Sequence, residues 1–525
     1  MNFNSKLVSS SLSFIDDSSN LPFKIEADDK YGTLKFKTID GDTGGEPENI
    51  TIMFTIDSSA SMSDKSKDGK TKMDHSLFTL TRIIESLYSS NVYVCIAINH
   101  FNDEVHCVLD FTILSPTNKD QIICDIQGIQ PYGGTNMDAA LSDVNERINT
   151  EMLLGKSSKY IQIFMTDGEA NGGRIDPVVL AGVVPSGVSN IFIGYGMNHD
   201  AGMLSTLSEA QRNGEYRFID KIENSGLVYG EIIHNILYNL LDDPIITVEN
   251  GTIYNWKTNE WVHSLNLANI ALNTKRDFHI KAHVSKTKQV VVKLWAKEDG
   301  ENVCVGHIVT QDNDDMNLTR FAFKLRTQEL LYEARKIISL TRVTPSLLFE
   351  NNDNTDKNDY IKTKLSAFML RLNKYIVNND LNNDNMMKLL QDDIYVCYNS
   401  INMPCSNMYT IARQTSQGNQ RAYSTSTSIN SGNCVKPTLT RQVAGGYVKP
   451  DINGMNLPHM QLKRSVSVNP MPIHKSTSNE SITSNEDDIE GNPFKDYNLI
   501  QQHITDTMYT GSKVMQDLMR QMSGK

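Results

Sequence analysis

The sequence predicts an α/β fold with a doubly wound, mostly parallel sheet, followed by a small antiparallel β domain, a helical segment and a disordered C-terminal tail. Three observations lead to this prediction. Short apolar runs rich in β-branched residues alternate with amphipathic helices up to about residue 241, the apolar period then changes to two, and helical periodicity returns before a polar end. A chain of 525 residues exceeds what one hydrophobic core usually spans, so two or more domains are expected.

The first half carries the α/β pattern. Residues 1–47 are predicted as an N-terminal extension with a short strand, and residues 48–241 as the parallel domain. Strands that are apolar on both faces imply helices on both sides of the sheet. Glu104–Phe111 follows a strand after a short turn, so we expect an antiparallel edge strand there. The other predicted strands are Ile50–Ile56, Val92–Ile98, Tyr160–Met165 and Asn190–Gly194, and the predicted helices span about Met73–Leu87, Met137–Ile148 and Gly226–Leu241.

The second half divides by its periodicity. Residues 242–312 alternate like strands joined by Asn-Gly and Lys-Thr-rich turns, which predicts an antiparallel, sandwich-like β domain. Residues 313–403 carry apolar stripes at helical spacing. Residues 404–490 are rich in Ser, Thr, Asn and Gln and are predicted to be a disordered linker, while residues 491–525 regain a pattern typical of short helices.

The composition of the chain argues against some classes of partner and indicates the cellular compartment. The net charge of -12 argues against nucleic acid, which is bound through clustered Lys and Arg. No apolar run reaches the ~18 residues that a bilayer requires, so no membrane span is expected. The N-terminus lacks the basic start and apolar stretch of a secretory signal, and the seven cysteines are scattered without a CxxC pair. We therefore expect a cytoplasmic protein with free thiols.

Small oxygen-bearing side chains lie in three loops of the first half. Asp57, Ser59 and Ser61 form a DxSxS pattern directly after the first buried strand. Thr135 lies in a Gly-rich loop before a helix, and Asp167 ends a later parallel strand. Each alone is ambiguous, because Asp, Ser and Thr also cap helices and form ordinary turns. Together, in this order at strand ends of one sheet, they are a strong signal for a ligand site.

These motifs give the chain its resemblance to a known family. Over about Glu48–Leu241 the sequence resembles the von Willebrand factor A family, whose metal-ion-dependent adhesion site combines DxSxS, a Thr before a later helix and an Asp after the next strand. All five positions match. Carboxylates and hydroxyls are hard donors that suit Mg²⁺, or Mn²⁺ in its place, and they leave an octahedral ion short of one ligand and still positive.

The resemblance implies how such a site is used. An Asp or Glu of a partner protein fills the open position, with Ser59, Ser61 and often Thr135 touching the metal directly, while Asp57 and Asp167 act partly through water. The segments after this domain resemble the interdomain region of a group of intracellular members, some of which carry a RING finger. This chain has no Cys/His cluster that could fold as a RING, so ligase activity is not carried over.

We therefore predict a non-enzymatic, Mg²⁺-dependent protein-interaction module that scaffolds an intracellular complex. No HExxH motif and no GxxxxGK[ST] loop point to catalysis. The alternative is an accessory or substrate-recruiting subunit of a ubiquitin-ligase or ATPase machine. A third reading, a structural part of a particle or surface, requires unconventional export.

Overall fold

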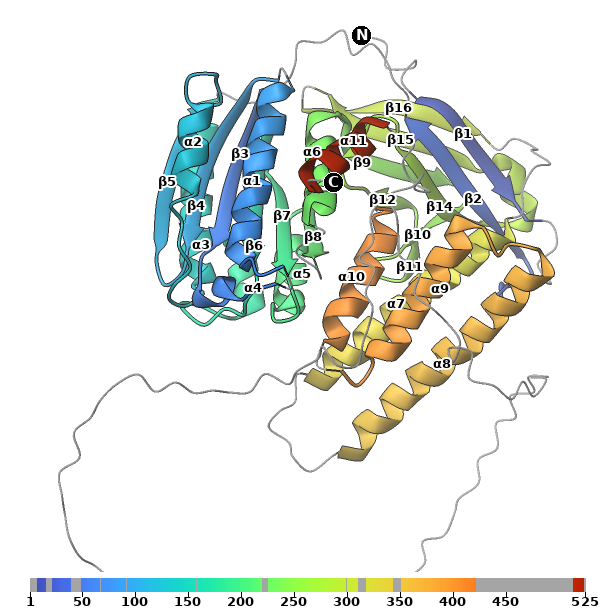
Figure 1. Ribbon diagram of the computed structural model, residues 1–525. Coiled ribbons are helices and arrows are strands. Elements are labelled where there is room, and N and C mark those ends of the chain that lie inside the picture. The colour runs from blue at the N-terminus through green and yellow to red at the C-terminus, as the bar shows by residue number, and fades with distance from the viewer. Residues whose placement is uncertain are drawn as a thin grey trace, which may run out of the picture. The chain divides into compact units, whose positions relative to one another are not determined.

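The computed structural model, shown in Figure 1, confirms the predicted fold class. It describes residues 7–15, 21–38, 49–66, 68–90, 92–155, 159–219, 225–298, 300–309, 318–342, 351–403, 405–421 and 513–523.

A six-stranded sheet forms the centre of the first domain. Its strand order is β5-β4-β3-β6-β7-β8, and every neighbouring pair is parallel except β4 and β5. The predicted antiparallel edge strand is thereby confirmed. Since β4 and β5 lie on one side of β3 and the later strands on the other, the direction of winding reverses between β3 and β6. The strands are β3 Ile50–Asp57, β4 Val94–Phe101, β5 Val105–Ile113, β6 Lys159–Thr166, β7 Ser189–Tyr195 and β8 Gly214–Ile219.

Helices cover both faces of this sheet, as the two-sided apolar strands require. Ile52 and Phe54 of β3 pack with α1, α2 and α6, whereas Met53 points to the opposite face and packs with α3. Aromatic residues of the central strands add to the core on that second face, against α3, α4 and α5. The helices are α1 Lys72–Ser89, α2 Lys119–Ile126, α3 Met137–Leu153, α4 Pro177–Ala181, α5 Ala201–Glu209 and α6 Ser225–Leu237.

This domain differs from the sequence prediction in three helices, one strand and one helix end. Helices α2, α4 and α5 were not predicted, because at 8, 5 and 9 residues they are too short to show a clear apolar stripe. Strand β8 was missed because Glu215 and Arg217 interrupt its apolar pattern. Arg217 is buried, and its guanidinium lies 2.6 Å from the Glu231 carboxylate of α6. The predicted helix ending at Leu241 was too long, because α6 ends at Leu237 and the next strand begins two residues later.

The β domain consists of two antiparallel sheets around a shared apolar core. One sheet has the order β1-β2-β14-β10-β11 and the other β12-β9-β15-β16, with β13 also paired to β9. Strands β1 and β2 thus join the β domain through β14, although the sequence predicted a separate N-terminal extension. The strands are β1 Leu7–Phe14, β2 Asp29–Thr38, β9 Asn239–Glu249, β10 Thr252–Asn255, β11 Glu260–Val262, β12 Ser264–Asn266, β13 Ile270–Ala271, β14 Lys275–His283, β15 Val291–Glu298 and β16 Glu301–Val309.

The helical segment continues past its predicted end at residue 403. Helices α7 Thr319–Arg342, α8 Asn351–Asn378 and α9 Asn385–Ser400 share an apolar core. The prediction of disorder from residue 404 was wrong for α10, Ser406–Gly418. This helix is polar, but its polar groups are buried and paired: Arg413 lies 3.1 Å from Asp393 of α9. The rest of the predicted linker lies outside the described residues.

A last helix, α11 Lys513–Ser523, packs against α6 and α1 of the first domain (Figure 1). Met515, Met519 and Met522 are buried in the same core as those two helices. The approach is close at Gly230, where a Cβ atom would lie 2.5 Å from the Cα of Met519. None of the helices among the described residues combines the length and apolar character needed to cross a bilayer.

We expect Met519→Asp to release α11, because a carboxylate buried without a partner between α6 and α1 costs several kcal/mol. Trypsin should then cleave after Lys513 and Arg520 faster in the folded protein, as followed by mass spectrometry. The matched control is Val514→Asp, since the Val514 side chain is 45% exposed. Equal cleavage rates in both variants would show that α11 does not depend on this contact.

Candidate metal centre

Two carboxylates lie at the carboxyl ends of neighbouring central strands. Asp57 is the last residue of β3, and Asp167 directly follows β6. These parallel strands flank the point where the winding of the sheet reverses, which is where open α/β sheets place their ligands. Both carboxylates are fully buried, and the Thr166 hydroxyl donates a hydrogen bond to Asp57 Oδ2 at 2.5 Å. The sheet itself therefore brings the two acidic residues together.

The DxSxS segment turns back over the strand ends. The Ser59 amide donates to Asp57 Oδ1 at 2.8 Å, and a short 3₁₀ helix follows at Ala60–Ser63. The Ser59 and Ser61 hydroxyl oxygens lie 3.0 Å apart, and Ser61 Oγ donates to Asp167 Oδ1 at 2.7 Å. Local turn geometry thus places two hydroxyls beside the two carboxylates.

The loop of Thr135 is tied to both of these segments. Gly133, at φ +76°, accepts a hydrogen bond from the Ala60 amide at 3.1 Å, and this left-handed backbone favours glycine. The Thr135 amide donates to Asn171 Oδ1 at 2.7 Å. A Cβ atom placed on Gly168 would lie 3.3 Å from Thr135 Oγ1 and 3.8 Å from Ser61 Oγ, so these hydroxyls border the same small space. The structure therefore brings all five sequence-predicted residues together.

The donor set fits a small hard cation. Two oxygens bound at about 2.1 Å and at right angles around Mg²⁺ lie about 3.0 Å apart, which is the spacing of the Ser59 and Ser61 hydroxyls. Among the described residues, no three His, Cys, Asp or Glu side chains gather as a metal cluster. The site depends instead on two carboxylates and three hydroxyls, a combination typical of Mg²⁺ rather than of zinc.

Sequence reasoning missed one charged residue of this centre. Lys72, the first residue of α1, places its ammonium 2.6 Å from Asp167 Oδ2 and 3.0 Å from Asp64 Oδ2. Burial opposes the charged form of Lys72, but the Asp167 and Asp64 carboxylates outweigh it and raise its pKa. The motif gave no signal for this contact, because a lysine at a helix start is ordinarily a solvated side chain.

The electrostatics of Asp57 are unfavourable for a charged carboxylate. Burial, and secondarily the charge of Asp167, raise the pKa of Asp57 from 3.8 to about 6, although hydrogen bonds from Thr166 and Ser59 oppose the shift. A cation among these groups would relieve that cost. The donor set is therefore chemically suited to a divalent cation, and in the structure the Lys72 ammonium neutralises part of the carboxylate charge.

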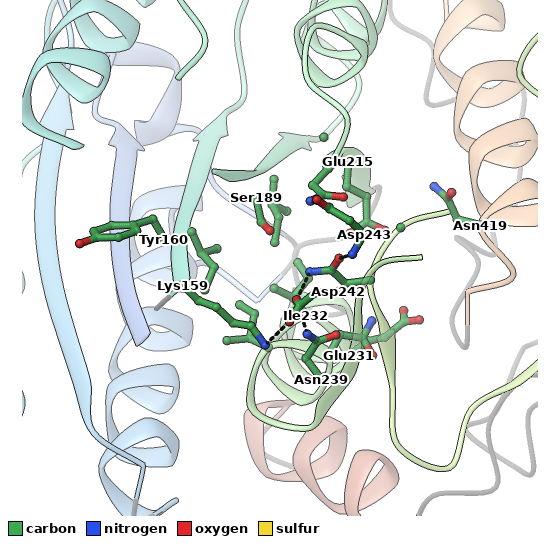
Figure 2. Close-up of a pocket in the computed structure, with 18 of the residues that line it drawn as sticks. Lys159, Tyr160, Ser189, Glu215, Glu231, Ile232, Asn239, Asp242, Asp243 and Asn419 are labelled. Atoms are coloured by element: carbon green, nitrogen blue, oxygen red, sulfur yellow. Dashed lines mark hydrogen bonds and ion pairs between the residues drawn. The ribbon is translucent and has the colours of Figure 1, made fainter. Parts of the chain in front are cut away.

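A larger cavity of about 450 Å³ lies at the amino ends of β6, β7 and β8 (Figure 2). Its walls come from these strands, from α6 and from the β domain. The charges that line it pair with one another: Lys159 lies 3.0 Å from Asp242, and Lys297 lies 2.6 Å from Asp243. The Lys159–Asp242 pair joins the two domains, and Asp243 of the β domain also accepts a hydrogen bond from the Asn213 side chain of the first domain. We therefore interpret the cavity as a polar crevice between them.

Fold and site together define a class: an α/β domain with a carboxylate and hydroxyl centre at the carboxyl ends of its strands. Residues 51–229 match the family model of the von Willebrand factor type A domain. The chain therefore contains a von Willebrand factor A (VWA) domain, a class that generally serves adhesion or protein interaction, sometimes through a metal ion. No curated protein matches the chain.

Several solved structures are similar to the chain. A von Willebrand factor type A protein from Catenulispora acidiphila is 14% identical, with 74% of this chain and 90% of that chain covered and a TM-score of 0.48. The ArnB paralog VWA2 from Sulfolobus acidocaldarius is 12% identical, with 78% and 98% covered and a TM-score of 0.40. Proximal thread matrix protein 1 from the mussel byssus, solved with a zinc-occupied MIDAS motif, is 17% identical, with 36% and 45% covered and a TM-score of 0.29.

We expect Asp57→Asn to stabilise the metal-free protein at neutral pH. A pKa raised from 3.8 to about 6 means that the folded state binds the proton more tightly, so the unfolding free energy falls as pH rises from about 4 through about 6. A difference of about 2 pKa units corresponds to at most about 3 kcal/mol. Urea unfolding in EDTA should give equal unfolding free energies for the variant and the wild type near pH 4. At pH 7 the unfolding free energy of the variant should be the larger.

The control is Asp120→Asn, whose carboxylate is 86% exposed in the wild type and should not produce this divergence with pH. A variant at Asp57 that is less stable than the wild type at pH 7 would show that the hydrogen bonds of this carboxylate outweigh its burial.

Proposed function

We propose that the VWA domain binds Mg²⁺, or Mn²⁺ in its place, and uses the ion to hold a carboxylate of a partner protein. The observation that carries the proposal is the convergence of three hydroxyls and two buried carboxylates from three separate loops. The proposed ligands are Asp57, Ser59, Ser61, Thr135 and Asp167.

The chain's own residues prepare this site in two ways. The neutral hydroxyls of Ser59, Ser61 and Thr135 serve as direct ligands, whereas Asp57 and Asp167 act partly through water. Hydrogen bonds from the Ser59 amide and from Thr166 fix the Asp57 carboxylate. An Mg²⁺ ion held by these residues would supply positive charge, which would favour an Asp or Glu side chain of a partner over a neutral one.

The wider role that we propose is a non-enzymatic scaffold of a cytoplasmic complex. The alternative, an accessory or substrate-recruiting subunit of a ubiquitin-ligase or ATPase machine, uses the same site. Copurification separates the two, because an accessory subunit brings an enzyme with it in stoichiometric amount.

Metal binding should depend on the hydroxyls that face the site. We expect Ser59→Ala combined with Ser61→Ala to weaken Mg²⁺ binding by at least about 100-fold in titration calorimetry, since two direct ligands are lost. Ser63→Ala is the matched control, because the Ser63 hydroxyl bonds to the Ala60 carbonyl of its own turn at 2.6 Å. Equal Mg²⁺ affinity in the double variant and the control would contradict the proposal.

Partner binding should need the metal and a carboxylate at once. EDTA should release a partner that was captured in Mg²⁺, and added Mg²⁺ should restore the binding of this partner. Asp57→Ala should abolish both Mg²⁺ binding and partner binding. Thr135→Ala should weaken the partner more than the metal, since this hydroxyl is the ligand expected to engage in the partner-bound form. A partner that stays bound in EDTA and tolerates Asp57→Ala would assign its binding to another surface.

Exposed apolar side chains continue from the loop that carries Asp167. Arg174 of this loop pairs with Asp138 in the first turn of α3, and the next apolar residues are Ile175, 58% exposed, and Val178, 75% exposed. Neighbouring exposed apolar residues beside a charged site are typical of a protein-binding surface. The partner that fits presents an acidic residue flanked by apolar ones.

We expect Ile175→Ser combined with Val178→Ser to weaken partner binding about 10-fold while leaving Mg²⁺ affinity unchanged, because only apolar contacts are lost. The matched control is Leu153→Ser with Leu154→Ser, two exposed residues about 25 Å away at the other end of α3. Surface plasmon resonance in Mg²⁺ measures both. A larger loss of partner affinity in the control variant would show that the partner does not bind at Ile175 and Val178.

A further inference from the structure

A lysine ammonium lies inside the proposed metal centre. Lys72 Nζ is 2.6 Å from Asp167 Oδ2 and 3.4 Å from the Ser61 carbonyl oxygen, and the Lys72 side chain is only 16% exposed. Ser61 and Asp167 are two of the five proposed ligands. The ammonium therefore neutralises a carboxylate that a divalent cation would otherwise use.

The backbone of Lys72 is held in a fixed position. Thr71 and Asp74 form a capping box at the start of α1, with both reciprocal hydrogen bonds present. The Lys72 amide donates to the Asp64 carbonyl at 3.0 Å. Only the flexible side chain of Lys72 is thus free to change its partner.

A second acceptor for this side chain lies outside the site. The Asp64 carboxylate is 3.0 Å from Lys72 Nζ and is 59% exposed, whereas that of Asp167 is fully buried. The ammonium can therefore leave Asp167 and keep an ion pair with Asp64. The move exchanges a buried contact for a solvent-exposed one.

We propose that Lys72 is a tethered cation that competes with the divalent metal for Asp167 and sets the affinity of the site, retreating to Asp64 when metal enters. The inference rests on the proposed function. Without metal, two buried carboxylates repel each other, and the Lys72 charge compensates them. A bound metal ion would compensate these carboxylate charges in place of Lys72. The free energy of metal binding is therefore reduced by the cost of breaking the Lys72–Asp167 ion pair.

The test is Mg²⁺ titration calorimetry on the full chain. We expect Lys72→Met, which keeps an unbranched side chain one atom shorter and removes its charge, to tighten Mg²⁺ binding by at least about 10-fold. The matched control is Lys70→Met, because Lys70 is exposed and its ammonium lies over the Phe78 ring, 5.8 Å from the centroid. This control should change the affinity by less than about 2-fold, and Lys72→Arg should stay near the wild type.

Removal of Asp64 tests the exchange itself. Asp64→Asn should weaken Mg²⁺ binding in the wild type, because the displaced ammonium loses its second acceptor, but it should have little effect in the Lys72→Met background. An equal effect in both backgrounds would mean that Asp64 acts on the metal directly and would overturn the exchange. Thermal unfolding in EDTA gives an independent readout: Lys72→Met should lower Tm, and Mg²⁺ should raise Tm more in this variant than in the wild type.

The outcomes separate this inference from the proposed function. If the wild type binds Mg²⁺ and Lys72→Met binds it equally or more weakly, Lys72 is not a competitor and only the inference fails. If neither protein binds Mg²⁺ and the partner persists in EDTA, both fail. Binding by Lys72→Met alone would support the competition in its strongest form.

Discussion

The burial of two carboxylates at adjacent strand ends is the constraint on which the centre depends. Asp57 and Asp167 are both withdrawn from water, and like charges in a low dielectric must be compensated. Compensation comes from separate elements: the Thr166 hydroxyl on β6, the Ser61 hydroxyl after β3 and the Lys72 ammonium on α1. The loops around the site are therefore tied to one another, because each donor must be held against an acceptor that belongs to another segment.

The convergence of the five candidate residues could be predicted because their positions follow from local sequence and one rule of topology. DxSxS is a contiguous turn, and the carboxyl ends of neighbouring parallel strands meet at the same edge of a sheet. Lys72 could not be predicted in this way. Its contact with Asp167 joins residues 95 positions apart, and it depends on the path of the chain from Asp64 back to the start of α1. Nothing in the local pattern distinguishes this lysine from the exposed Lys70.

Two of the elements that sequence reasoning missed share a physical cause. In β8 and α10, charged and polar residues are buried through pairing rather than exposed, so hydrophobic periodicity does not report their burial. Arg217 pairs with Glu231, and Arg413 with Asp393, each across two elements. Strand β1 was placed in a separate extension because its partner β2 joins the β domain through β14, more than 230 residues later.

Helix α1 makes two contacts through different parts of its length. Its flank packs against α11, while its first residue reaches Asp167. The capping box fixes the first turn, so the Lys72 ammonium can pass from Asp167 to Asp64 by side-chain rotation alone. The proposed exchange requires no shift of the helix axis. The apolar contact with α11 and the charge balance of the proposed metal centre therefore act on different parts of the same helix.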